Sequence, residues 1–134
     1  MEYVAQKHPL GCMIAAAAMV LDLTYEQVSD KVPLQSIEDL RQTGINGLGI
    51  VAWNNLKTLA RARGKVIFDF PDKPFILRPG LRYLGMLPTA NYLLTHVVAI
   101  DETGVVFDPD PAKEQSRENW ETYDFMAMLE FRSQ

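Results

Sequence analysis

A chain of 134 residues, of which 48% are hydrophobic and 22% charged, predicts a single soluble globular domain (residues 1–134) with its own core. Its net charge of −4, with acidic and basic residues interspersed, argues against a nucleic-acid partner. With one cysteine, no signal peptide and no apolar run long enough to cross a bilayer, the sequence predicts a cytoplasmic protein without disulfides or a membrane partner.

The N-terminal part of the chain carries the signals of two helices. Residues 12–23 include four consecutive alanines, which favour a helix, and apolar residues on every side, which predict that this helix is buried. Gly11 permits a tight entry into it. A second, short helix is predicted just after Thr24, because Thr24 and Gln27 form a T-x-x-Q capping box. Pro33 is expected to end this second helix.

Two further helices are predicted before the middle of the chain. Residues 35–42 form a candidate helix with Ser36 as its N-cap. After a glycine-rich loop, residues 50–63 carry hydrophobic side chains at helical spacing, and Gly64 is a suitable residue to follow the C-cap. The chain is therefore expected to be mostly helical up to this point.

After Gly64 the apolar spacing changes to the pattern of β-strands. Strands are predicted over residues 65–70, 82–89, 95–100 and 105–108. The proline-rich segment 72–80 is expected to be a loop with at most an edge strand, and the tail, 122–131, an amphipathic helix. A helical half followed by a β half predicts an α+β fold, with the two halves meeting at a cleft.

The last two predicted strands are expected to form a hairpin. Its loop is residues 102–104, a three-residue type with glycine at the left-handed position. In that register Val98 faces Asp108, and strand alternation places His96 on the same face as Val98. Asp108 then lies diagonal to His96, at about 7–8 Å between backbones, and a carboxylate can bridge that gap to an imidazole.

Four residues of complementary chemistry follow one another along the chain. Cys12 begins the apolar helix, whose N-terminus favours a thiolate, so it is the candidate nucleophile. His96 is the candidate general base and acid, and Asp108 the carboxylate that orients it. Gln6, in the loop that leads to Cys12, is the candidate donor to an oxyanion. A thiol, an amide, an imidazole and a carboxylate in this order are the parts of a cysteine hydrolase.

Each of these residues also has a simpler interpretation. Cys12 alone would be a small buried hydrophobe, His96 a core histidine, Asp108 the start of an Asp-Pro turn, and Gln6 an exposed polar residue near a terminus. Asp110 is the alternative orienting carboxylate if the hairpin register differs, and His8 an alternative base. Cys12, His8, His96 and Asp108 together are also a conceivable zinc set, although no metal-binding motif spacing is present.

Two segments give the chain a family resemblance. QKHPLGC (residues 6–12), with the alanine-rich helix and LTYEQV after it, and THVVAIDETGVVFDP (residues 95–109) resemble papain-like cysteine peptidases. The resemblance is greatest to the compact branch that contains the bacteriocin-processing double-glycine peptidases and their free-standing bacterial and phage relatives. Between residues 32 and 94 only the general layout is similar.

The resemblance implies a papain-like α+β domain with Cys12 as nucleophile, His96 as base and acid, Asp108 as orienting carboxylate and Gln6 as oxyanion donor. Relatives often carry glycine directly after the cysteine, whereas Met13 stands there in this chain, and its bulk is expected to narrow the cleft.

The expected activity is hydrolysis of an amide or isopeptide bond in a peptide or protein substrate, without a cofactor. Two alternatives stay open. A catalytically silent papain-like module would bind a peptide or protein, although a dead site has no need to keep all four residues. An acyltransferase would share the acyl-enzyme and pass the acyl group to an amine.

Overall fold

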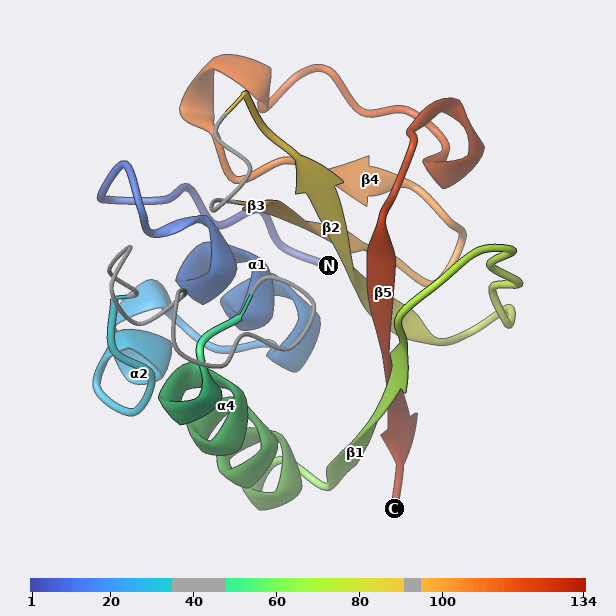
Figure 1. The fold of residues 1–134 in the computed structure, drawn as a ribbon. Coiled ribbons are helices and arrows are strands. Elements are labelled where there is room, and N and C mark those ends of the chain that lie inside the picture. The colour runs from blue at the N-terminus through green and yellow to red at the C-terminus, as the bar shows by residue number, and fades with distance from the viewer. Residues whose placement is uncertain (35–47, 91–94) are drawn as a thin grey trace.

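The computed structural model of the protein describes residues 1–34, 48–90 and 95–134 (Figure 1). The α-helices within these ranges are α1 (Cys12–Leu21), α2 (Tyr25–Ser29) and α4 (Ile50–Ala62), and the 3-10 turns there are η1 (Pro111–Lys113) and η2 (Trp120–Thr122). Its strands are β1 (Lys65–Phe70), β2 (Arg82–Pro88), β3 (Thr95–Ile100), β4 (Val106–Phe107) and β5 (Ala127–Ser133). Within the described ranges, no helix is long and apolar enough to span a membrane.

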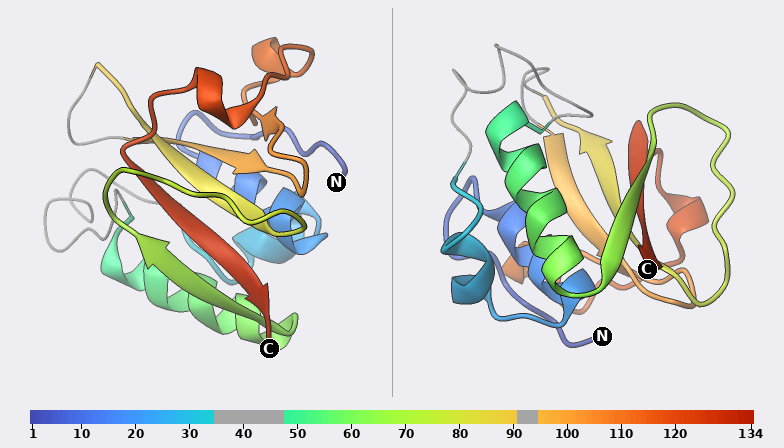
Figure 2. Two further views of the ribbon diagram at one scale, coloured as in Figure 1. Left: turned by 90° about the vertical axis from the view of Figure 1, so that its right-hand side faces the viewer. Right: turned by 90° about the horizontal axis from the view of Figure 1, so that it is seen from below.

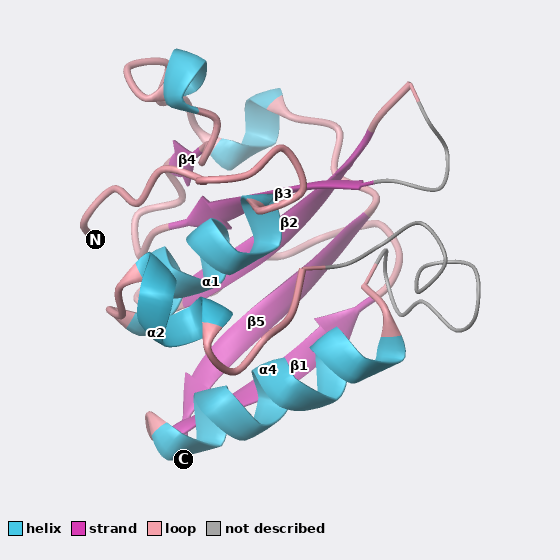
Figure 3. Ribbon diagram, turned by 90° about the vertical axis from the view of Figure 1, so that its left-hand side faces the viewer, coloured by secondary structure: helices cyan, strands magenta, loops and turns pink. Residues whose placement is uncertain are grey.

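The helices lie on one face of an antiparallel sheet with the strand order β1-β5-β2-β3-β4 (Figures 1 and 2). Helix α1 packs against β2 and β3, and α4 packs against β1 (Figure 3). The segment between β1 and β2 passes over the other face, where Phe75, Leu77 and Leu81 cover a second, smaller core (Figure 2). The architecture is the α+β arrangement predicted from the sequence.

Helix α1 is the central element of the main core. Residues 13–21 are all buried, as its uniformly apolar composition predicts. The helix ends two residues earlier than expected, because Asp22 adopts a left-handed conformation with φ of 56° and caps it. The capping box of Thr24 and Gln27 is formed as predicted. Helix α2 ends at Ser29, four residues before Pro33, which was expected to end it.

Helix α4 begins and ends close to the predicted bounds. Its last turn leads into Gly64, which takes a φ of +73°, the left-handed conformation that favours glycine after a C-cap. The candidate helix over residues 35–42, with Ser36 as its cap, lies outside the described residues.

The prediction of a helix over residues 122–131 is wrong. The second half of this segment belongs to β5, which lies between β1 and β2 in the sheet, and Thr122 ends the 3-10 turn η2. Ala127, Leu129 and Phe131 point into the core under the helices, whereas Met128 belongs to the core on the other face. This alternation has the period of a strand, and pairing on both sides satisfies the backbone of β5.

The predicted hairpin is confirmed in register. Ala99 pairs with Phe107 and Ile100 with Val106, so the three loop residues are 102–104. Gly104 has a φ of +85°, as the left-handed position requires. The β4 ladder is shorter than the predicted strand, and segment 72–80 contains no strand.

Candidate active site

His96 and Asp108 meet where β3 begins and β4 has just ended. The His96 Nε2 atom lies 2.7 Å from Oδ1 of Asp108, whose residue is only 8% exposed. The same Oδ1 accepts a hydrogen bond of 2.9 Å from the backbone N–H of Asp110. The carboxylate is therefore held by two donors at the position that the hairpin register predicted.

The electrostatics of this pair favour an ionised carboxylate and a protonated imidazole. The hydrogen bond to Asp108, followed by one to Cys12, raises the pKa of His96 to about 10, although burial opposes the shift. Burial also opposes ionisation of Asp108, but the hydrogen bonds from His96 and from the Asp110 N–H outweigh it and hold the Asp108 pKa below its usual value.

The Asp110 side chain caps a turn and does not contact His96 in the part of the chain that the structure describes. Its side chain accepts a hydrogen bond of 3.0 Å from the N–H of Ala112 and so caps the 3-10 turn η1. The partner of His96 in this structure is Asp108 and not Asp110.

Cys12 lies at the first position of α1 and is half-buried. Gly11 is the N-cap and offers no side-chain acceptor, so the first-turn N–H groups keep their partial positive charge. The Sγ atom lies 3.9 Å from the carbonyl oxygen of Thr95, the residue before His96. Because α1 packs on β3, the Cys12 thiol lies beside the start of β3, 83 residues further along the chain.

Gln6 forms hydrogen bonds to two segments of the site, the turn after Asp108 and the loop before Cys12. Its backbone N–H donates to the Pro109 carbonyl at 2.9 Å, one residue beyond Asp108. Its side-chain Nε2 donates to the His8 carbonyl at 3.2 Å, in the loop that leads to Cys12. The Oε1 atom is buried and accepts no hydrogen bond from the residues that the structure describes.

His8 accepts hydrogen bonds from the backbone of the loop that leads to Cys12. Its Nδ1 accepts the N–H of Leu10 at 3.0 Å, and its carbonyl accepts the N–H of Gly11 at 2.8 Å. The His8 side chain is exposed, and the histidine that pairs with Asp108 is His96 and not His8. Across residues 1–34, 48–90 and 95–134, no three His, Cys, Asp or Glu side chains are grouped to hold a metal ion.

The loop before Cys12 rests on α2. Lys7 forms an ion pair with Glu26, and its ammonium lies 5.6 Å from the centre of the Tyr25 ring. A Cβ atom on Gly11 would lie 2.4 Å from the Tyr25 hydroxyl oxygen. Only glycine therefore fits at this position without a shift of its neighbours.

Met13 does not narrow the cleft as expected. It is 2% exposed and belongs to the main core, so the helix turns its side chain inward. The physical reason is the helical period, since the residue after Cys12 lies about 100° further round the helix.

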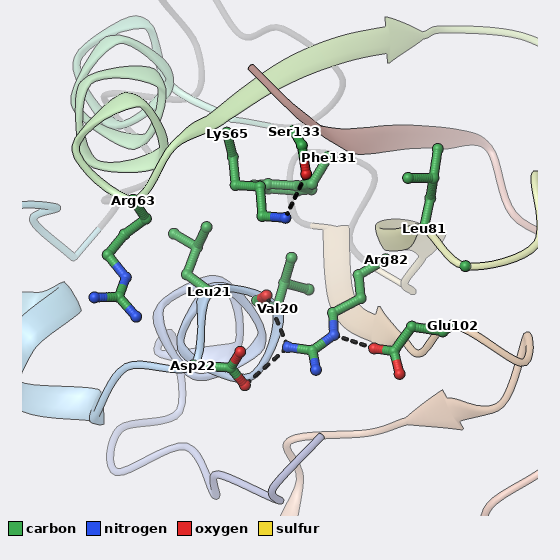
Figure 4. Close-up of a pocket in the computed structure, with 11 residues that line it drawn as sticks. Val20, Leu21, Asp22, Arg63, Lys65, Leu81, Arg82, Glu102, Phe131 and Ser133 are labelled. Carbon is green, nitrogen blue, oxygen red and sulfur yellow. Dashed lines mark hydrogen bonds and ion pairs between the residues drawn. The ribbon is translucent and has the colours of Figure 1, made fainter.

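The cavity drawn in Figure 4 lies at the other end of α1 from Cys12 and has a volume of about 310 Å³. Arg82 of β2 donates there to Asp22 at 2.8 Å and to the Val20 carbonyl at 3.1 Å, and it forms an ion pair with Glu102. A cation at a helix C-terminus is favourable, so Arg82 fixes α1 against the sheet. None of the four candidate residues lines this cavity.

Two side chains near the site belong to no motif of the sequence. The Tyr3 hydroxyl donates to the Asp110 carbonyl at 3.1 Å. The Arg117 guanidinium lies 4.2 Å from the ring centre of Phe107, the residue before Asp108, and 5.8 Å from that of Tyr3. The contacts of Tyr3 could not be found from local spacing, because Asp110 and Arg117 lie more than a hundred residues further along the chain.

The fold is that of double-glycine peptidase domains. A double-glycine motif protease from an AMS/PCAT transporter, crystallised in complex with the leader peptide, is similar over 99% of this chain and 91% of its own, with a TM-score of 0.65 and 18% identity. The peptidase domain of Streptococcus mutans ComA is similar over 98% of this chain and 99% of its own, with a TM-score of 0.56 and 12% identity. No protein-family model and no curated protein matches the sequence. The fold expected from the resemblance is thus confirmed.

Proposed function

We propose that this protein is a cysteine peptidase-like hydrolase that cleaves an amide or isopeptide bond in a peptide or protein. The observation that carries the proposal is the contact of His96 Nε2 with the buried Asp108 carboxylate at 2.7 Å. The Cys12 thiol lies at the same end of β3, with its Sγ atom 3.9 Å from the carbonyl oxygen of Thr95, the residue before His96. An imidazole between a thiol and a buried carboxylate is the arrangement that activates a cysteine nucleophile.

The chemistry follows from this arrangement. The Cys12 thiolate forms a C–S bond with the substrate carbonyl, and the carbonyl electrons move to the oxygen. Collapse of this intermediate breaks the C–N bond, and the leaving amine takes a proton from His96. A water molecule, which gives a proton back to His96, then attacks the acyl-enzyme and releases the acid and the thiolate. With Nε2 held by Asp108, Nδ1 is the ring nitrogen that exchanges these protons.

Two donors would stabilise the oxyanion. The backbone N–H of Cys12 lies in the first turn of α1 and has no partner within the helix. The Gln6 Nε2 carries two hydrogens, of which one goes to the His8 carbonyl, and the second is proposed to meet the oxyanion. Both donors act on charge that exists only in the transition state and in the intermediate.

A peptide substrate is supported by the similar AMS/PCAT protease, which was crystallised with a leader peptide. The proposed substrate here is a peptide or protein segment, and the reaction needs no cofactor. The same acyl-enzyme would form in an acyltransferase, and the two differ only in whether water or an amine accepts the acyl group.

The test is labelling and turnover in the folded protein. A peptide with a C-terminal electrophile should form an adduct on Cys12 in the wild type, located by mass spectrometry, and no adduct in Cys12→Ala. A peptide library should give products with new carboxylates, and an added amine should not be incorporated. Binding without an adduct or cleavage would indicate a silent module, and amine incorporation an acyltransferase. Labelling only after unfolding would show that Cys12 is a structural thiol.

A further inference from the structure

The first six residues are fixed to the turn that follows the orienting carboxylate. Residues 108–110, the Asp108 turn, offer two successive carbonyls to them: that of Pro109 accepts the N–H of Gln6 at 2.9 Å, and that of Asp110 accepts the hydroxyl of Tyr3 at 3.1 Å. The proposed oxyanion donor and the carboxylate that orients His96 are therefore attached to one short piece of backbone.

The position of the Tyr3 ring is defined by a cation and by burial. The Arg117 guanidinium lies 5.8 Å from the centre of the Tyr3 ring and 4.2 Å from that of Phe107. Arg117 is itself held, since its Nε donates to the Glu114 carbonyl at 3.2 Å. Burial first, and then the charges of nearby carboxylates, raise the pKa of Tyr3 to about 12, so its hydroxyl stays protonated and remains a donor at neutral pH.

We propose that Tyr3 is a positioning residue, whose hydroxyl bond to the Asp110 carbonyl holds the N-terminal segment on the Asp108 turn and so fixes Gln6, whose amide binds the loop that leads to Cys12. The inference rests on the proposed hydrolase function. Tyr3 touches neither the nucleophile nor the histidine, and it acts through Gln6. Because an oxyanion donor must lie within hydrogen-bond distance of the developing charge, a small drift of this segment lowers the rate without weakening substrate binding.

The test is a double-mutant cycle with Tyr3→Phe and Gln6→Ala, measured on the cleaved peptide. Tyr3→Phe keeps the ring beside Arg117 and removes only the hydroxyl, so kcat should fall about 2- to 10-fold at constant KM, the scale of one hydrogen bond. Gln6→Ala should lower kcat by about 10²- to 10³-fold. Adding Tyr3→Phe to Gln6→Ala should then cause no further loss, because the residue through which Tyr3 acts is gone.

Alkylation of Cys12 by iodoacetamide separates this role from general loosening of the site. Alkylation forms no oxyanion, so its rate should be the same in Tyr3→Phe and in the wild type. A merely structural role would disturb the pair of His96 and Asp108 and lower both rates together. Tyr123→Phe is the matched control: the Asp108 charge also acts on Tyr123, but no hydrogen bond joins its hydroxyl to the Asp108 turn within the described residues. Its kcat should equal that of the wild type.

Three results would overturn the inference: an unchanged kcat in Tyr3→Phe, an effect that multiplies with that of Gln6→Ala, or an equal fall in the alkylation rate. A different result marks failure of the hydrolase proposal. In that case the wild type neither cleaves peptides nor forms the Cys12 adduct with the electrophilic peptide, and the role of Tyr3 falls with it.

Discussion

The Nε2 atom of His96 lies 2.7 Å from Oδ1 of Asp108, although the two residues belong to different strands of a hairpin. The buried carboxylate holds the ring by one nitrogen and keeps it charged. Nδ1 is then the ring nitrogen that can exchange a proton with Cys12. Several consequences of this contact can be measured.

The first concerns the reactivity of Cys12. Because the His96 pKa is raised to about 10, the imidazolium is present at neutral and mildly acidic pH. Cysteines beside a protonated histidine are generally more reactive. Iodoacetamide should therefore label folded wild-type protein readily at about pH 6, and His96→Ala should abolish this labelling without unfolding the protein. Mass spectrometry of the adduct, followed over a pH series, checks both rates. A wild-type rate that rises only above about pH 8 would contradict the ion pair.

The second prediction compares two neighbouring carboxylates. Asp108→Asn should lower kcat by orders of magnitude with the fold intact, since the corresponding change in serine proteases costs about 10⁴. Asp110→Asn is the matched control, because Asp110 only caps η1 and asparagine is an equally good cap. Its kcat should stay within about twofold of the wild type. The reverse order of effects would mean that Asp110 orients the histidine in solution.

The third prediction concerns stability against pH. The pKa of His96 is raised in the folded state, so its pairing with Asp108 contributes fully below about pH 6.5, the pKa of an unfolded histidine. The contribution is lost as the pH rises toward about 10. In acid it is lost again as Asp108, whose folded pKa is lowered, takes up a proton.

Urea unfolding of Cys12→Ala and of Cys12→Ala with Asp108→Asn, at pH values from about 4 to 10, isolates this pair from titration of the thiol. The difference in unfolding free energy between the two proteins should be largest between about pH 5 and 6 and should shrink as the pH rises. A difference independent of pH would show that the two residues are not coupled by charge.

The fourth prediction concerns the entry to α1. Gly11→Ala would bring a Cβ within 2.4 Å of the Tyr25 hydroxyl oxygen, so it should lower the unfolding free energy by about 1–3 kcal/mol. Tyr25→Phe in the same chain removes that oxygen and should restore most of the loss. The contact of 3.1 Å between the new Cβ and the His8 carbonyl would remain, so the rescue should be incomplete.

Urea unfolding of the two single variants and the double variant measures this coupling. Tyr25→Phe alone is the control and should change stability little. If the double variant is as unstable as Gly11→Ala, the clash lies with the backbone of the loop and not with the tyrosine.

One local pattern misled the sequence interpretation at the C-terminal tail. Glu130 follows the apolar residues 125–129, and a charged residue there is compatible with the polar face of an amphipathic helix, yet it is 1% exposed within a strand. The Tyr83 hydroxyl and the Arg132 guanidinium both donate to its carboxylate, and these donors make its burial possible. Arg132 lies in the same strand, but Tyr83 belongs to β2, and a donor from another strand leaves no trace in the spacing of residues 122–131.

The sequence by itself determined what depends on neighbours in the chain. The apolar helix that begins at Cys12, the capping box at Thr24 and the hairpin turn at Gly104 are local, and the turn fixes the register that brings His96 to Asp108. Short-range sterics and hydrogen bonds decide such features, so they can be predicted from spacing.

Only the tertiary structure decided how the parts of the site meet. Packing of α1 on β3 brings Cys12 to His96, and the hydrogen bond from Gln6 to Pro109 joins the N-terminal segment to the Asp108 turn. These partners lie far apart in the chain, and burial of apolar surface between the helices and the sheet brings them together. No periodicity within either segment encodes that contact, because it depends on the shape of the whole core.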